Sequence, residues 1–394
     1  MKKYIILLII YLCTLKFFQI RTLSNFTIYA CLYSTLLYLI CAYVINKRKL
    51  QISLHSEFGV KYLNFFLICC FVPCIGSLLF WNARISDLFF VVLPNLSLLI
   101  YYYLHSNRYS EKVIINVLSL LAFSRIIITI IQQYTYPNIW FGAPLYNNDE
   151  LLFDIRSGII RYYLSLAFWF NVLLSFYYFN HLIKKFSKKY LFYFLITIIG
   201  IYIDQSRTMM VLCCLIYFYI YIRNIRDMSK YSNIIIIVIA FLCIIYFNFF
   251  FNDLFEQTQE DLNEDYVRLL SYKIFLFDFW ANPLAVIIGN GYPVPGAYTK
   301  TLEQFADFTV FREDVGIVGA LNQYGIGLCI AIILYLWKII KKRQHISDYL
   351  VAYALFSFGY LFLYSPVHYD VQSNAFWGTY MFLVDLSFKN NKYE

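Results

Sequence analysis

The sequence predicts an all-α, polytopic membrane protein. Of its 394 residues, 61% are hydrophobic and only 14% are charged, whereas a soluble domain carries about 25% charged residues. The mean hydropathy is +0.62. The apolar residues also fall in runs long enough to cross the roughly 30 Å hydrocarbon layer as helices. These observations exclude an ordinary cytosolic globule and a disordered chain.

Twelve apolar runs are predicted to be transmembrane helices, because lipid does not tolerate irregular backbone. A pair of helices is favoured over a single long one at 190–222, with a turn at residues 204–207. The predicted spans lie near residues 4–20, 26–45, 62–82, 88–104, 113–132, 158–179, 190–204, 208–222, 234–251, 315–337, 349–364 and 375–387.

The distribution of charge predicts the orientation. The net charge is +9, but it is scattered between apolar runs, so no nucleic-acid partner is expected. Twelve spans with both termini in the cytoplasm put most of the 32 Lys and Arg residues in cytoplasmic loops, as the positive-inside rule requires. No small-residue cleavage site follows Lys2 and Lys3, so the first apolar run is expected to be retained as a helix.

Three regions are expected along the chain: spans one to nine in residues 1–251, one large outer loop in residues 252–314, and spans ten to twelve in residues 315–394. The segment 266–280 is amphipathic and aromatic, which predicts a helix at the membrane surface. Gly289 and Gly291 follow in a turn-rich stretch. There the glycines permit either close approach to a ligand or a simple re-entrant loop.

No metal or cofactor is expected. All ten Cys lie in predicted spans, four of the five His lie on the cytoplasmic side, and no Asp-x-Asp motif is present. The pattern therefore offers neither a disulfide framework nor a set of metal ligands on the outer side.

Six arginines at or near membrane depth carry the main functional signal. An arginine in a span costs roughly 3 to 17 kcal/mol unless it faces a polar partner. Guanidinium groups bind phosphate oxygens in bidentate fashion, so the set predicts a site for a pyrophosphate-linked lipid. Ion pairs, such as Asp154 with Arg156 or Asp204 with Arg207, and snorkelling to the interface remain alternatives. The six, all expected on the outer side, are Arg125, Arg156, Arg161, Arg207, Arg268 and Arg312.

Several short motifs resemble the O-antigen polymerase family, to which the O-antigen ligases are related. They are Ser206-Arg207-Thr208 opening a span, the Arg268 helix running into Asn282-Pro283 and Gly289-x-Gly291, and Glu313-Asp314-x-Gly316 before a span with Leu321 and Gly325-x-Gly327. The resemblance covers about residues 120–335.

The resemblance implies a membrane-embedded glycosyltransferase of the GT-C type in the bacterial inner membrane. Such an enzyme transfers a glycan from undecaprenyl pyrophosphate to a lipid-linked repeat unit on the outer, periplasmic face, and a chain-length regulator is a candidate partner. The resemblance assigns Arg207 and Arg268 to the pyrophosphate; Arg156 and Arg161 join them on the charge argument alone. The large loop has no His where ligases are expected to have one, which favours a polymerase for O-antigen or capsule.

The acceptor hydroxyl needs a base, for which Asp314, with Glu313 beside it, is the candidate. A carboxylate that merely favours a helix start is the alternative for this pair. His368, near Asp370 in the last outer loop, is the alternative base.

Two other classes compete with the polymerase. A flippase for lipid-linked oligosaccharide would have short outer loops and more charge inside its spans. An enzyme using polyprenyl-phosphate sugars typically has acids in its first outer loop, and residues 21–25 contain none.

Overall fold

The computed structural model describes residues 2–14, 25–54, 59–136, 138, 140–141, 153–156, 159–162, 168–204, 206–226, 233, 267–294, 310, 312–367 and 371–392, at some positions by backbone alone. The elements in these ranges are α1 (Lys2–Thr14), α2 (Asn25–Leu54), α3 (Val60–Trp81), α4 (Ile85–Val92), η1 (Leu93–Leu99), α5 (Ile100–Ser106), α6 (Glu111–Thr135), β1 (Phe153–Arg156), β2 (Ile159–Tyr162), α7 (Phe168–Lys184), α8 (Lys188–Ile203), α9 (Arg207–Asn224), α11 (Val267–Lys273), η3 (Ile274–Asp278), α12 (Ala285–Ile288), η4 (Arg312–Val315), α14 (Gly316–Tyr324), α15 (Ile326–Lys341), η5 (Arg343–His345), α16 (Asp348–Tyr360) and α17 (Val371–Lys392).

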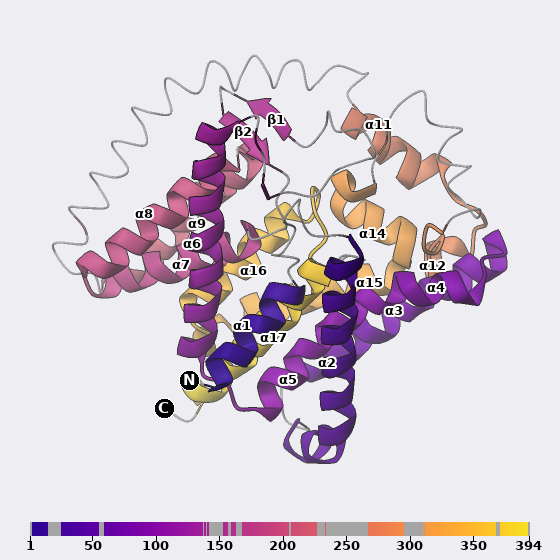
Figure 1. The fold of residues 1–394 in the computed structure, drawn as a ribbon, viewed down its shortest axis with the longest axis horizontal. Helices are drawn as coiled ribbons and strands as arrows, with labels where there is room; N and C mark the ends of the chain where they lie inside the picture. The colour runs from indigo at the N-terminus through magenta and orange to yellow at the C-terminus, as the bar shows by residue number, and fades with distance from the viewer. Residues whose placement is uncertain are drawn as a thin grey trace.

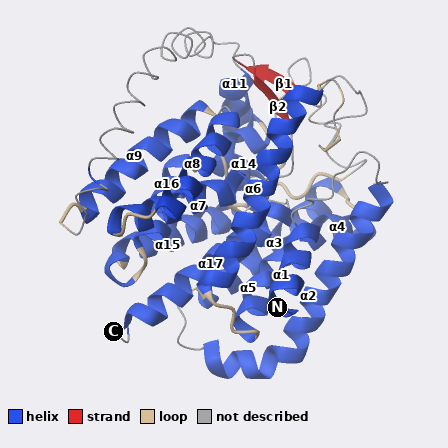
Figure 2. Cartoon of the chain, turned by 60° about the vertical axis from the view of Figure 1, so that its left-hand side comes forward, coloured by secondary structure: helices blue, strands red, loops and turns tan. Residues whose placement is uncertain are grey.

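The helices pack into one bundle with two distinct ends. Both chain termini lie at one end, and the β1–β2 hairpin and α11 lie at the other (Figure 1). The turned view keeps this arrangement, with α6 running between the two ends (Figure 2). Lys3 donates from its Nζ to the carbonyl of Asn107 at 2.8 Å, which places the N-terminus beside the start of α6.

Four helices in the described ranges are long and apolar enough to cross a bilayer. The third of them joins α4, η1 and α5 into one rod. The fold is therefore that of an α-helical membrane protein, while the total of twelve spans stays a prediction. The four are Tyr29–Asn46, Val60–Trp81, Ile85–Ser106 and Glu111–Thr135.

Among the described residues, two differences between the predicted spans and the helices bear on the candidate site. Span six was expected to begin at residue 158, but two paired antiparallel strands occupy 153–156 and 159–162, and α7 begins at Phe168. Span ten is broken at Gly325 into α14 and α15. The predicted turn between spans seven and eight is confirmed, because α8 ends at Ile203 and α9 begins at Arg207. The expected span at 234–251 lies outside the described residues.

The last helix, α17, is the centre of the bundle although it is rich in polar residues. Its buried polar side chains bond to neighbouring helices: Tyr11 and Thr379 share a hydrogen bond of 2.7 Å, and Asn374 donates to Asn95 at 2.8 Å. Asp385 accepts the Gly59 backbone N–H at 2.8 Å and the Tyr101 hydroxyl at 2.5 Å. That carboxylate caps the start of α3, where the helix dipole favours negative charge. Polar contacts therefore hold this helix among the others.

The segment 289–292 runs through the interior beside α3 and the α14–α15 break. Asn290 and Tyr292 are fully buried. The N–H of Asn290 donates to the carbonyl of Asn322 at 2.8 Å, and its own carbonyl accepts the Trp81 indole at 2.8 Å. The Tyr292 hydroxyl donates to the carbonyl of Cys70 at 2.6 Å. The bundle thus satisfies an irregular backbone segment that lipid would not.

Gly289 and Gly291 serve this crossing rather than a ligand-facing loop. Gly289 has φ +81°, and a Cβ there would stand 2.0 Å from the carbonyl oxygen of Gln323; at Gly291 it would stand 2.3 Å from Ser77 Oγ. The close approach that these glycines permit is therefore to the protein itself, which favours the re-entrant alternative over ligand contact.

We expect Gly289→Ala to lower the free energy of unfolding by roughly 2 to 5 kcal/mol, because the new Cβ meets a backbone oxygen and the φ value is strained for alanine. Thermal unfolding of the purified protein in detergent measures it. Gly327→Ala is the matched control, since its Cβ would lie 3.6 Å from Cys69 Sγ in ordinary contact. Equal stability of the two variants would contradict the close packing of Gly289 against the backbone of Gln323.

Candidate active site

The turn at 361–367, which follows α16, holds two other elements in place. The carbonyl of Leu361 accepts the N–H of Ile317, in the first turn of α14, at 2.7 Å. The carbonyl of Phe362 accepts the hydroxyl of Tyr272, on α11. This turn therefore holds two functional candidates against the end of α16: the start of α14, which follows Asp314, and the last turn of α11, the helix that carries Arg268.

The start of α9 reaches the same place. The hydroxyls of Ser206 and Tyr360 lie 3.3 Å apart. Arg207 is the next residue and the first of α9, so its backbone lies beside the 361–367 turn. Its side chain is outside the described part of the structure.

Arg125 has a carboxylate partner of its own. Its guanidinium contacts Asp204 through two nitrogens, at 2.8 and 3.4 Å, and the two side chains are only 11% and 16% exposed. The ion-pair alternative therefore holds for Arg125, with Asp204 as its partner. The expected pair of Asp204 with Arg207 lies outside the described part of the structure. This pair holds α6 to the α8–α9 turn.

Arg268 and Tyr272 lie one helical turn apart on α11. Arg268 is half-buried. Partial burial raises the pKa of the Tyr272 hydroxyl, and the positive charge of Arg268 opposes that rise. The guanidinium is therefore close enough to affect the group that contacts the 361–367 turn.

Arg312 is held by aromatic rings. It is 8% exposed, and its guanidinium carbon lies 5.3 Å from the ring centre of Phe275 and 5.7 Å from that of Phe279. Such cation–π contacts stabilise a desolvated arginine by about 1 to 2 kcal/mol each. Arg312 thus ties η4 to η3, which directly follows α11, the helix that carries Arg268.

Glu313 and Asp314 lie in η4, three and two residues before the first residue of α14. Asp314 is half-buried; only the backbone of Glu313 is described. Gly316, the first residue of α14, has φ +48° and packs directly against the 361–367 turn. A Cβ at this position would stand 2.2 Å from the carbonyl oxygen of Leu361. The Asp314 segment is therefore fixed within two residues of the turn.

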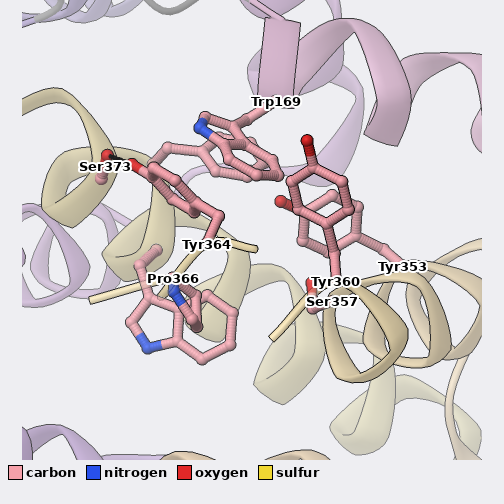
Figure 3. A pocket seen from close by; sticks show the side chains of 9 residues that line it. Trp169, Tyr353, Ser357, Tyr360, Tyr364, Pro366 and Ser373 are labelled. Carbon is pink, nitrogen blue, oxygen red and sulfur yellow. Dashed lines mark hydrogen bonds between the residues drawn. The ribbon is translucent and has the colours of Figure 1, made fainter. Parts of the chain in front are cut away.

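An aromatic pocket lies under this turn, between α7, α16 and α17. Trp169 and Tyr364 have ring centres 4.4 Å apart, and Tyr360 lies 5.6 Å from Trp169. Figure 3 shows Trp169 against Tyr364, with Tyr353 and Tyr360 across the pocket. Its volume is about 10 Å³, which is room for about one water. The lining comprises Trp169, Tyr353, Ser357, Tyr360, Tyr364, Pro366, Ser373, Phe376 and Trp377.

Arg156 and Arg161 lie on the β1–β2 hairpin. In its register Asp154 faces Arg161, and Arg156 faces Ile159. The side-chain amide of Gln133, near the end of α6, bonds both backbone groups of Ile160, at 2.6 and 2.9 Å. The hairpin is therefore held against the end of α6, at the bundle end that also carries α11 (Figure 1).

The structure thus brings four of the predicted residues onto elements that meet at one turn: Arg207, Arg268, Arg312 and Asp314. Arg125, on α6, is paired with Asp204 at the end of α8. Arg156 and Arg161 share the end of the bundle but belong to a separate element. His368 lies outside the described residues.

The aromatic pocket is what the sequence argument missed. With 39 Tyr and 39 Phe, aromatic side chains are too common to mark a site. Trp is scarcer, with 6 residues, and two of these line the pocket; their scarcity was the signal available.

The described residues contain no group of three or more His, Cys, Asp or Glu side chains placed to hold a metal ion. The nine cysteines that the structure describes are free thiols.

No protein-family model matches this sequence, and no curated protein matches it.

We expect Arg125→Ala to destabilise the protein by about 3 kcal/mol, because it leaves the Asp204 carboxylate at low exposure without its guanidinium. The double variant Arg125→Met/Asp204→Leu recovers most of that loss. Unfolding of Arg125→Met, Asp204→Leu and the double variant measures the coupling. Lys184→Ala is the control, since that side chain is 50% exposed in its ion pair and costs at most about 1 kcal/mol. Additive losses would contradict a coupled pair.

Proposed function

We propose that this protein is a polysaccharide repeat-unit polymerase. It transfers a glycan from undecaprenyl pyrophosphate to a lipid-linked repeat unit on the outer face of the bacterial inner membrane. The observation that carries the proposal is the convergence of the Arg207, Arg268, Arg312 and Asp314 segments on the 361–367 turn, above an aromatic pocket.

The arginines suit the leaving group. When the bond between the anomeric carbon and the pyrophosphate breaks, the diphosphate oxygens gain negative charge, and fixed guanidinium groups stabilise it. Arg207 and Arg268 are the candidates for direct contact. Arg312, enclosed by Phe275 and Phe279, positions the α11–η4 wall. Arg156 and Arg161 extend positive charge along the same end of the bundle.

The carboxylate suits the acceptor. The acceptor hydroxyl oxygen forms the new bond to the anomeric carbon and gives up its proton, for which Asp314 is the proposed base. Glu313 and His368 remain the alternatives. The fixed joint at Gly316 keeps the base in a set position relative to the turn, which lowers the entropy cost of the reaction.

The aromatic pocket suits a sugar ring, because rigid aromatic faces pack against the apolar face of a pyranose. At about 10 Å³ the pocket must widen to admit one. Trp169 and Tyr364 are the ring pair that would separate.

This function requires the full topology expected from charge: about twelve spans, both termini in the cytoplasm and the arginine-bearing end facing the periplasm. That topology places the aromatic pocket within reach of both lipid-linked substrates. A chain-length regulator would meet the same face of the membrane.

We expect Arg207→Ala and Arg268→Ala each to abolish long polysaccharide chains, because the leaving group loses its charge partner. Polysaccharide ladders from a deletion strain complemented with each variant measure this. Arg226→Ala, an exposed arginine at the end of α9 nearer the chain termini, is the matched control and should give a normal ladder. Normal ladders from both site variants, with normal membrane levels, would remove the proposed leaving-group site.

For Asp314→Asn we expect a rate at least about a hundredfold lower with donor still bound, because the amide cannot accept the proton. A reconstituted assay separates turnover from donor binding. Asp87→Asn, a half-buried carboxylate in the first turn of α4, serves as the control. Unchanged turnover in Asp314→Asn would discard it as the base.

A further inference from the structure

A second pocket lies at the bundle end that carries both termini, between the starts of α6 and α16 and the ends of α7 and α9. Its volume is about 420 Å³, within the usual range of small-molecule sites. The lining is polar and charged, unlike that of the aromatic pocket at the other end of α16. It comprises Glu111, Asn180, His181, Lys184, Arg223, Gln344, Ile346, Ser347, Asp348 and Tyr349.

One side of this pocket has an excess of positive charge. Asp348 is shared by two cations: Lys184 Nζ lies 3.0 Å from one carboxylate oxygen, and Arg223 Nε lies 2.8 Å from the other. Arg223 is fixed further by bonds to the Tyr219 hydroxyl and the Arg343 carbonyl, at 2.9 and 2.8 Å. Two positive charges facing one negative charge leave room for an anionic group, such as a phosphate.

Another part of the lining offers acceptors and negative charge. Glu111 accepts a hydrogen bond from the neutral Tyr349 hydroxyl at 2.9 Å, and no ion pair to it is found among the described residues. Asn180 is 4% exposed, and within the described structure its Oδ1 has no hydrogen-bond partner. A buried oxygen of this kind is costly until a donor reaches it, and a carboxylate near it favours a donor that is positively charged.

We propose that this pocket binds a phosphoethanolamine group, with the phosphate toward Lys184 and Arg223 and the ammonium toward Glu111 and Asn180. The lining carries two acids and two bases besides His181, so a ligand with no net charge fits better than a simple anion or cation. The N–H donors of a primary ammonium satisfy Asn180 Oδ1, which a trimethylammonium group cannot do. Because the site lies at the ends of apolar helices, the expected source is the headgroup of a phospholipid.

The test uses the full-length protein, delipidated in detergent and titrated with short-chain phosphatidylethanolamine, phosphatidylcholine or phosphatidylglycerol, with binding read by native mass spectrometry. We expect one phosphatidylethanolamine to bind at least about tenfold more tightly than either other lipid, the size expected for a lost charge-assisted hydrogen bond. Competition by free phosphoethanolamine identifies the source: displacement indicates a soluble ligand, and its absence indicates the lipid.

Glu111→Gln and Asn180→Leu should each weaken phosphatidylethanolamine binding about tenfold. Lys112→Gln, next to Glu111 but exposed and outside the lining, should leave it unchanged. If Asn180→Leu fails to fold, Glu111→Gln alone decides. Equal binding of phosphatidylethanolamine and phosphatidylcholine to the wild type, or unchanged binding in Glu111→Gln, would overturn the proposal. Neither result bears on the polymerase site, which lies at the other end of α7 and α16.

Discussion

Backbone N–H and C=O groups that lie at membrane depth must form hydrogen bonds inside the protein, because lipid offers none. The rest of this structure depends on how the backbone of residues 289–292 obtains these hydrogen bonds. The segment crosses the bundle only because Gly76, Gly289, Gly291 and Gly325 lack side chains where backbones touch. The hydroxyl of Tyr292 donates a hydrogen bond to α3 and accepts one from the side chain of Asn95. Asn95 in turn accepts a hydrogen bond from α17. The crossing therefore links the long loop to the central helix, and it sets where α14, and with it Asp314, can lie.

The candidate active site is built by the same principle at the 361–367 turn. Just after α16 ends, two backbone carbonyls accept hydrogen bonds from α11 and α14. The hydroxyl of Tyr360, the last residue of α16, contacts Ser206 at the start of α9. Three segments far apart in sequence therefore come together through a few polar contacts. This arrangement puts arginine-bearing segments, a carboxylate and an aromatic pocket within one region, and the proposed glycan transfer rests on that combination.

The sequence predicted most helices because apolar runs and basic loops follow directly from the solvation cost of crossing a bilayer. It singled out six arginines, but it could not tell that Arg125 is already paired with a carboxylate, because Arg125 and Asp204 are 79 residues apart and meet only after folding. The hairpin at 153–162 was missed because its strands border an apolar run, which a span-length window counts as helix. For the segment at Gly289 and Gly291, the sequence predicted that the backbone approaches another group closely. It could not predict the partners, Gln323 and Ser77, because they come from distant segments.

The most direct test of the central claim is product analysis with the purified protein and a defined undecaprenyl-pyrophosphate-linked repeat unit. The polymerase account predicts products of two or more repeats on one lipid, with one undecaprenyl pyrophosphate released for each bond formed. Movement of the intact repeat across a proteoliposome membrane, with no longer product and no released lipid diphosphate, would contradict it and would instead identify a flippase.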